Sequence, residues 1–268
     1  MKDKVVIITG ASSGIGKALS IEMAARGAIV VLAARSRDKI VEIEKELNAG
    51  GARVMAVQTD VSLEADCRNL IAATIEKFGR IDILVNNAGI SMRALFEHVD
   101  LEVMRRLMNV NFWGTVYCTR FALPYLLQAR GSVVGVSSIG GYKGMPGRTG
   151  YSASKFAIQG FLETLRIENL KKGLHVLIAC PGFTASNIRN TALSADGSLQ
   201  GESPRDEKNM MKAEKVAVKI ANAIEKRKKI LVMTMEGKII VLLNKLFPFW
   251  MDRRVYDNLA KEPDSPFK

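Results

Sequence analysis

"TGASSGIGKALS", residues 9–20, follows a short apolar run and opens a helical pattern. Its glycines, Gly10, Gly14 and Gly16, permit a tight turn in which backbone N–H groups at the helix start can approach a pyrophosphate. The spacing is G-x-x-x-G-x-G, which differs from the G-x-G-x-x-G dinucleotide fingerprint. Glycines at such a turn can also be purely structural. This stretch therefore predicts a nucleotide-binding turn between a strand and a helix, which other residues must support.

Short β-branched runs alternate with longer helical patterns along the chain. Strands are expected at residues 5–9, 29–33, 54–58, 83–86, 133–137, 176–180 and 230–233. Helices are expected near residues 16–26, 39–48, 64–78, 101–128, 151–170 and 213–226. The strand segments are apolar on both faces, as in a parallel sheet that helices cover on both sides. The chain is therefore predicted to form an α/β, doubly wound fold.

The composition fits a single domain over residues 1–268, because 48% of the residues are hydrophobic and can supply a sizeable core. The net charge of +12 favours anionic ligands, anionic membrane surfaces or nucleic acid without choosing among them. No nucleic-acid motif and no interleaving of aromatic with basic residues is recognised, so no nucleic-acid partner is expected.

Cysteine and histidine usage argues against a metal site. Cys67, Cys118 and Cys180 are odd in number and widely spaced, which suggests neither a disulfide framework nor a zinc site and fits a reducing cytoplasm. His98 and His175 have no carboxylate or cysteine partner at ligand spacing. Both histidines are interpreted as structural, and no metal is predicted.

The end of the second predicted strand, "VVLAARSRD" at residues 30–38, bears on cofactor choice. Enzymes that bind NAD place an acidic residue here for the ribose 2′-hydroxyl, whereas an arginine accommodates the 2′-phosphate of NADP. Arg35 follows the strand, while the competing acid, Asp38, comes several residues late. The stretch predicts NADP(H), and a solvated basic helix start is the alternative.

"YSASK", residues 151–155, places Tyr151 and Lys155 one helical turn apart on the same face. A tyrosine with a pKa near 10 is a poor acid or base at neutral pH unless a nearby cation stabilises its phenolate. Ser138 lies 13 residues earlier at a strand end, where its hydroxyl could hold the same substrate oxygen. The alternative is a tyrosine that packs on a lysine stem, with Ser137 as a serine that only satisfies the strand end.

Together these motifs resemble those of the short-chain dehydrogenase/reductase family. In the family's order the chain carries "TGASSGIG" at 9–16, "DV" at 60–61, "NNAG" at 86–89, Asn111, "SS" at 137–138, "YSASK" at 151–155 and "PG" at 181–182. The resemblance covers roughly residues 4–235. It implies a Rossmann-like sheet of seven parallel strands, a nicotinamide cofactor, and a homodimer or homotetramer.

The resemblance also implies roles for individual residues. Asp60 would reach the adenine amino group with Val61 beside the ring, and residues 87–89 would line the cofactor and brace the central strand. Asn111, in a kinked helix, would hold a water that connects Lys155 to solvent. The cofactor-binding residues are predicted to be Gly10, Ser12, Ser13, Gly14, Ile15, Gly16, Arg35, Ser36, Asp60, Val61, Asn87, Ala88, Gly89, Tyr151, Lys155, Pro181, Gly182, Thr184 and Ser186.

Two positions depart from the family pattern. Many NADP-using relatives carry a basic residue where this chain has Ser13, so Arg35 would hold the 2′-phosphate with help only from neighbouring hydroxyls. After Pro181-Gly182 the family usually shows an aliphatic residue and then a threonine. Thr184 and Ser186 stand at these positions, and the Ser186 hydroxyl can still be offered to the nicotinamide carboxamide.

The predicted catalytic residues are Asn111, Ser138, Tyr151 and Lys155. In the expected reaction a hydride passes between the nicotinamide of NADP(H) and a carbonyl carbon, while Tyr151 protonates the developing alkoxide and Ser138 hydrogen-bonds to it. NADP(H) is favoured over NAD(H). The alternatives are a catalytically silent NADP(H)-binding sensor and a reductase of small ketones or sugars.

The long irregular stretch at residues 186–210 is expected to form the substrate loop, closing over the nicotinamide as a lid, because structureless loops of that length are usually functional or disordered. It offers a mixed surface with no obvious clamp for a carboxylate. Arg189 could bind an anion, although a solvated arginine is the favoured interpretation.

The tail "GKIIVLLNKLFPFWMDRRVY", residues 237–256, is apolar but interrupted by Asn244, Lys245 and Pro248, so it is not expected to span a bilayer. Apolar residues flanked by cations are typical of an interfacial membrane anchor, and packing on the core or against a second subunit is the alternative. With this C-terminal extension, residues 237–268, the chain resembles lipid-directed reductases such as those of the 3-ketosphinganine type. A hydrophobic, long-chain 3-keto substrate is therefore favoured, with the chain in the cytoplasm or at the cytoplasmic membrane surface.

Overall fold

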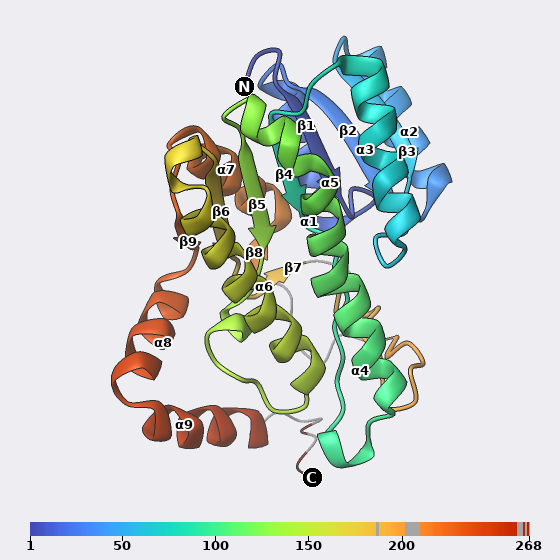
Figure 1. Ribbon diagram of the computed structural model, residues 1–268. Coiled ribbons are helices and arrows are strands. Elements are labelled where there is room, and N and C mark those ends of the chain that lie inside the picture. Colours follow the sequence, from blue (N-terminus) through green and yellow to red (C-terminus); the bar gives the residue numbers. More distant parts are fainter. Residues whose placement is uncertain (186–187, 202–209, 262–264, 266, 268) are drawn as a thin grey trace.

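Seven parallel strands form the centre of the structure, in the order β3-β2-β1-β4-β5-β6-β9 (Figure 1). The computed structural model describes residues 1–185, 188–201, 210–261, 265 and 267. The strands are β1 (Val5–Thr9), β2 (Ile29–Ala34), β3 (Arg53–Gln58), β4 (Ile83–Asn86), β5 (Ser132–Val136), β6 (His175–Cys180) and β9 (Ile230–Val232). Every predicted strand is present, with ends shifted by at most one residue. The α/β, doubly wound fold is confirmed.

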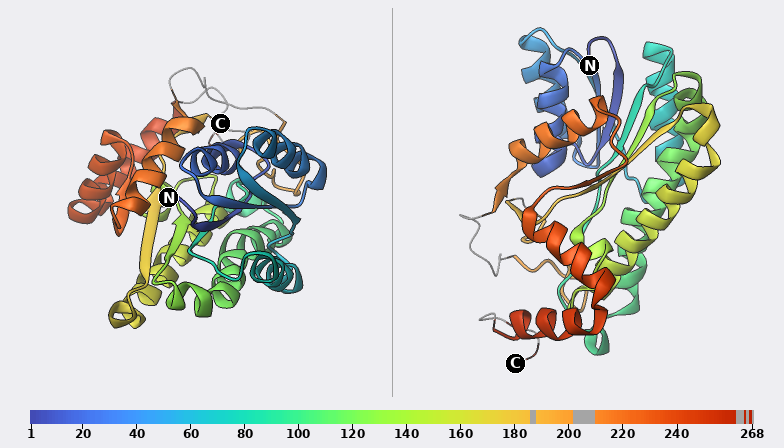
Figure 2. Two further views of the ribbon diagram at one scale, coloured as in Figure 1. Left: turned by 90° about the horizontal axis from the view of Figure 1, so that it is seen from above. Right: turned by 90° about the vertical axis from the view of Figure 1, so that its left-hand side faces the viewer.

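Helices cover both faces of the sheet (Figures 1 and 2). One face carries α1 (Gly14–Ala25), α2 (Arg37–Ala49) and α7 (Ala213–Glu225), and the other carries α3 (Glu64–Phe78), α5 (Gly114–Gln128) and α6 (Thr149–Glu168). Successive strand side chains point to opposite faces, so Val6 and Ile8 pack under the first group while Val5 and Ile7 pack under the second. This burial on both sides explains why the strand segments are uniformly apolar.

The helical segment predicted at 101–128 is present with those bounds, but it is not one uniform α-helix. It is divided into α4 (Leu101–Leu107), a π-helical turn (Met108–Trp113) and α5. Hydrophobic periodicity does not register such a turn, because the chain continues in the same direction with helical backbone angles on both sides. π-Helical turns often occur at functional sites, and this one contains Asn111.

Beyond the sheet, two helices that the sequence analysis did not assign follow β9: α8 (Met235–Leu246) and α9 (Pro248–Ala260). They project past the carboxyl ends of the strands (Figure 2). The Thr234 hydroxyl accepts a bond from the Gly237 amide at 3.0 Å and caps α8, while Pro248 begins α9, a position that suits its missing N–H. Within the described residues, no helix is both long enough and apolar enough to cross a membrane.

Short elements complete the described chain. The strands β7 (Thr184–Ala185) and β8 (Met211–Lys212) pair in parallel at the two ends of the predicted substrate loop. Single 3-10 turns occupy Phe96–His98, Ile139–Gly141 and Leu170–Lys172. The Ile139–Gly141 turn directly follows Ser138 and therefore lies beside the site described next.

Candidate active site

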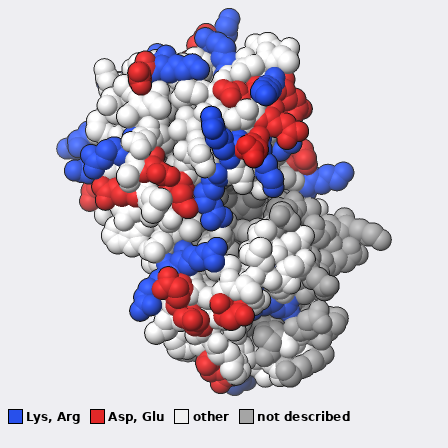
Figure 3. Space-filling model, turned by 90° about the vertical axis from the view of Figure 1, so that its right-hand side faces the viewer, with Lys and Arg blue, Asp and Glu red and all other residues white. Residues whose placement is uncertain are grey.

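A cavity of about 1350 Å³ opens at the carboxyl ends of the strands. It is lined by residues that follow each strand from β1 to β6, and it lies where the strand order reverses between β1 and β4. Open α/β sheets bind ligands at this place. On the face drawn in Figure 3, Lys and Arg side chains gather beside a hollow. The volume exceeds the roughly 300–1,000 Å³ of an ordinary small-molecule pocket, so a dinucleotide and a second ligand have room.

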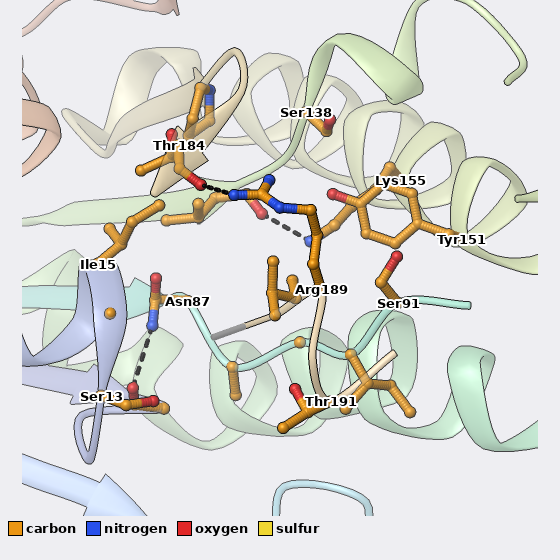
Figure 4. A pocket seen from close by; sticks show the side chains of 18 of the residues that line it. Ser13, Ile15, Asn87, Ser91, Ser138, Tyr151, Lys155, Thr184, Arg189 and Thr191 are labelled. Atoms are coloured by element: carbon orange, nitrogen blue, oxygen red, sulfur yellow. Dashed lines mark hydrogen bonds between the residues drawn. The ribbon is translucent and has the colours of Figure 1, made fainter. Parts of the chain in front are cut away.

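The glycine turn between β1 and α1 forms one end of this cavity. Gly10 has a φ of +66°, a conformation that side chains disfavour. A Cβ on Gly16 would lie 2.1 Å from the Gly10 carbonyl oxygen, so only glycine allows the helix to pack on the turn. The α1 N-terminus, where N–H groups suit a pyrophosphate, thus lies at the cavity. The predicted residues that line it here are Gly10, Ser12, Ser13, Gly14 and Ile15. Figure 4 shows Ser13 and Ile15 at this end.

After β2, the cavity wall is basic. Arg35 and Ser36, which are predicted to bind the cofactor, line it, and Lys39 joins them from the first turn of α2. Neither Asp38 nor Arg37 is among the described lining residues. Lys39 was missed by the sequence analysis, although its position in the run Arg35, Arg37, Lys39 could have drawn attention to it. An acidic side chain would be needed at this wall to bind a ribose 2′-hydroxyl, and Arg35 and Lys39 lie there instead.

The ends of β3 and β4 supply the next part of the wall. Asp60 lines the cavity with Val61, and its carboxylate accepts bonds from the Ser62 amide and hydroxyl at 3.0 and 2.7 Å. The Asn87 side chain donates to the Thr9 carbonyl oxygen at 2.9 Å, which ties β4 to β1. Asn87, Ala88 and Gly89 all line the cavity. The "NNAG" stretch thus both ends a strand and faces the cavity.

Ser138, Tyr151 and Lys155 lie together on the other side of the cavity (Figure 4). A Cβ on Gly140 would lie 3.3 Å from Tyr151 Cε1 and 3.5 Å from Ser138 Oγ, so the tyrosine ring and the serine hydroxyl face the same glycine. The Lys155 Nζ lies 5.6 Å from the centre of the Tyr151 ring. Ser137 also lines the cavity, but its hydroxyl donates to the Lys155 carbonyl oxygen at 3.3 Å.

Burial dominates the electrostatics of these groups. It raises the pKa of Tyr151 above its usual value, while hydrogen bonding by Ser138 and the positive charge of Arg148 act in the opposite direction. Burial also lowers the pKa of Lys155 to about 8, against an opposing effect of Cys180. Lys155 is only 4% exposed, and its Nζ donates to the Val136 carbonyl oxygen at 2.9 Å. A lysine with such a pKa exchanges protons near neutral pH.

Asn111 is fully buried in the π-helical turn, whereas Asn109 is exposed. Its side-chain amide exchanges two hydrogen bonds with the backbone of Ile90, at 2.8 and 3.0 Å, and also donates to the Ser154 hydroxyl at 2.9 Å. A Cβ on Gly89 would lie 3.2 Å from Asn111 Oδ1 and 3.4 Å from Lys155 Nζ. The amide of Asn111 and the Lys155 ammonium therefore approach the same point of the chain.

After β6, three further residues that are predicted to bind the cofactor line the cavity, Pro181, Gly182 and Thr184, while Ser186 lies outside the described residues. The interpretation of Arg189 as a solvated side chain is wrong. Arg189 is 5% exposed, lines the cavity and donates to the Thr184 carbonyl oxygen at 2.8 Å. In Figure 4 its guanidinium lies between Thr184 and Tyr151.

Several cavity residues escaped the sequence analysis. Ile139, Met145 and Arg148 come from the segment between Ser138 and Tyr151, and their nearness to the motif could have indicated them. Gly237 and Ile240 reach the cavity from α8, which lies far from every motif in the sequence. No local sequence pattern indicates that α8 packs beside the cavity.

Metal ligation has no support among the described residues, which include no group of three or more His, Cys, Asp or Glu able to hold an ion. His175 is buried between the Ser132 hydroxyl, 2.9 Å from its Nδ1, and the Lys228 carbonyl oxygen, 2.8 Å from its Nε2. Burial lowers its pKa. His98 is exposed on the 3-10 turn after β4.

Comparisons with known proteins agree with this geometry. The family described as short chain dehydrogenase matches residues 4–196. The 11-beta-hydroxysteroid dehydrogenase 1A of Arabidopsis thaliana is 44% identical over 201 residues, which cover 73% of this chain and 57% of that protein. The match thus spans little more than half of the plant relative.

Two solved structures share the fold over most of their length. A short chain dehydrogenase/reductase from Burkholderia phymatum, in complex with NAD, has a TM-score of 0.83 and 25% identity, covering 91% of this chain and 94% of its own. An alcohol dehydrogenase from Thermococcus sibiricus, complexed with 5-hydroxy-NADP, has a TM-score of 0.77 and 25% identity, covering 87% and 96%. The motifs, the sheet order and these matches together show that the chain belongs to the short-chain dehydrogenase family.

Proposed function

We propose that this chain is an NADP(H)-dependent oxidoreductase that transfers a hydride between nicotinamide and a carbonyl or alcohol carbon. The observation that carries the proposal is the grouping of Ser138, Tyr151 and Lys155 at one side of a cavity whose other end is the glycine turn. A Cβ at Gly16 would collide with that turn, so α1 packs directly on it and its N-terminus lies at the cavity, where backbone N–H groups can hold a pyrophosphate. The residues present therefore fit a dinucleotide.

The protein's own groups would handle the proton. When bound, the cofactor supplies or accepts the hydride. Tyr151 donates a proton to the oxygen of a carbonyl substrate during reduction, and the Ser138 hydroxyl donates a hydrogen bond to the same oxygen. The Lys155 cation favours the phenolate that Tyr151 becomes. Asn111, close to Lys155, would hold the water through which the proton is replaced. A silent sensor would have no need of this set of groups.

We propose a hydrophobic substrate, such as a long-chain 3-keto lipid. Apolar side chains of Ile139, Met145, Leu193, Leu199 and Ile240 line the cavity beside the proposed catalytic residues. The plant relative is named for a hydroxysteroid, also a hydrophobic molecule. Two of these residues, Leu193 and Leu199, belong to the stretch 186–210, which we propose as the lid.

Oxidation of NADPH, followed across carbonyl compounds from small sugars to steroids and long-chain 3-ketolipids, tests this function. We expect kcat/KM for the acyl-chain ketones to exceed that for small polar ketones at least tenfold, because each buried methylene contributes about 0.8 kcal/mol. Faster turnover of the small polar ketones would contradict the lipid assignment. Tight NADPH binding without turnover of any carbonyl compound would favour the sensor.

Cofactor preference is expected to depend on Arg35. We predict that Arg35→Ala weakens NADPH binding about tenfold and leaves NADH binding within twofold, because a charge-assisted bond to the 2′-phosphate contributes about 1.5 kcal/mol or more. Arg37→Ala is the matched control, since Arg37 is also exposed but is not among the described cavity residues. Fluorescence titration gives the four dissociation constants, and tighter binding of NADH than NADPH by the unaltered protein would refute the preference.

We also propose that residues 237–256 dock on an anionic membrane surface. The exposed fractions of Phe247 and Phe249 are 58% and 83%, a large apolar exposure beside Lys245 and Arg253. We expect the unaltered protein to sediment with phosphatidylserine vesicles and the double variant Phe247→Ser/Phe249→Ser to stay in solution.

The control for docking is Phe96→Ser, which removes a 59% exposed phenylalanine from the turn after β4. It should leave vesicle binding unchanged. The same variants, measured by light scattering, separate membrane docking from a subunit contact. A subunit contact would give two results. The unaltered protein would not sediment with vesicles, and the double variant would change the size of the proposed homodimer or homotetramer.

A further inference from the structure

The loop between β5 and α6 forms one wall of the active-site cavity. From Ser138 to Arg148 it contains the 3-10 turn Ile139–Gly141 and one isolated β-bridge, between Arg148 and Ala94, and it contributes Ile139, Met145 and Arg148 to the cavity lining. A loop with so little regular structure must be held from outside if Ser138 is to keep its place beside Tyr151.

Helices α8 and α9 make contacts that hold this loop. The Asn244 side chain, on α8, donates to the Tyr142 carbonyl oxygen at 2.9 Å. Lys143 forms an ion pair with Asp252 of α9, and its Nζ also lies 3.4 Å from the Pro248 carbonyl oxygen. The α8 backbone is equally close, because a Cβ on Gly237 would lie 2.7 Å from Ile139 Cδ1.

The Lys143–Asp252 pair is unusual in its burial. Lys143 is 8% exposed, although it lies on a loop, whereas the Asp252 side chain is 63% exposed. Lysines are almost never so buried without a partner, and removing one member of such a pair leaves an uncompensated charge. Among the described residues, the carbonyl oxygen of Pro248 would then be the remaining partner of Lys143. Without the Asp252 carboxylate, the Lys143 ammonium is therefore expected to move toward water, and the loop that contains Lys143 is expected to shift with it.

We propose that Lys143 and Asp252 form a latch through which α9 positions the loop 138–148 for the carbonyl substrate. Both act as positioning residues, because neither is among the described residues that line the active-site cavity. The latch rests on the proposed function. It makes the two C-terminal helices part of the substrate site, while the cofactor end, built from the ends of β1, β2 and β4, stays independent of them.

The test compares Asp252→Asn with Asp257→Asn in the full chain. Asp257 lies on the same helix, is exposed and lines the same small cavity as Lys143 and Asp252, but it makes no ion pair with the described residues. It therefore tests whether the paired carboxylate matters, and not merely a carboxylate near Lys143. We expect Asp252→Asn to raise KM for a long-chain 3-ketolipid about tenfold, to change kcat less than threefold, and to leave the NADPH dissociation constant within twofold. Amide hydrogen exchange in residues 139–148 should become faster, and Asp257→Asn should change none of these quantities.

Two further variants separate positioning from general stability. Asp252→Glu keeps the charge and should restore KM to within threefold of the unaltered protein. Lys143→Met, added to Asp252→Asn, removes the buried charge and should slow the exchange of the loop again. A lower melting temperature with unchanged KM and unchanged loop exchange would overturn the latch. If no carbonyl compound is turned over at all, the proposed function fails, and the exchange measurement still decides the latch: faster exchange supports it and unchanged exchange overturns it.

Discussion

Replacement of Tyr151 by phenylalanine is expected to lower kcat about 1,000-fold, within the range of about 10²–10⁴ that a positioned acid contributes, because it removes the hydroxyl that donates the proton. The ring of Tyr151 is half-buried and would stay in place, so folding and NADPH binding should remain within twofold. Stopped-flow or steady-state NADPH oxidation with the best carbonyl substrate gives the rate.

The matched control for this experiment is Tyr142→Phe. Tyr142 lies on the same loop as Ser138 but is not among the described cavity residues, and burial raises its pKa. It should retain turnover within about threefold. Comparable turnover by Tyr151→Phe and the unaltered protein would remove the central claim of the mechanism.

Lys155→Met is expected to lower turnover at least 100-fold and, at the same time, to stabilise the cofactor-free protein. The pKa of Lys155 is lowered to about 8 by burial, against about 10.4 for an unfolded lysine. Between these values the unfolded chain binds more protons than the folded one, so stability rises with pH across this window. Below about pH 8 Lys155 is charged in the folded protein, and the burial of this charge lowers the free energy of unfolding by about 3 kcal/mol.

Urea unfolding at pH 7 and pH 10 checks this prediction. At pH 7 we expect Lys155→Met to be more stable than the unaltered protein by up to about 3 kcal/mol, and at pH 10 we expect most of the difference to disappear. Lys171→Met, which changes an exposed lysine, should show no such dependence. A variant that is less stable at pH 7, or whose advantage is the same at both pH values, would show that Lys155 is not destabilising when charged.

Local sequence signals were sufficient for the sheet and for most of the cavity. Strands buried on both faces produce uniform apolar runs, and parallel strands bring all their carboxyl ends to one edge. Residues that follow a strand by one or two positions, such as Gly10, Arg35 and Ser138, are therefore assigned to the cavity as soon as the strand is recognised. Tyr151 and Lys155 are four residues apart, and the geometry of a helix alone places two such side chains on the same face.

The tertiary structure decided what depends on contacts between distant parts of the chain. Arg189 is buried where its guanidinium contacts the Thr184 carbonyl oxygen and the sulfur of Met210, and no neighbouring residue in the sequence indicates that burial. Lys143 and Asp252 are 109 residues apart, and their pairing follows from the way α8 and α9 return over the loop. Hydrophobic periodicity predicts which face of a helix or strand is buried. It does not predict which other helix, strand or loop covers that face. The fold could therefore be predicted from the sequence, whereas the substrate end of the cavity required the three-dimensional arrangement.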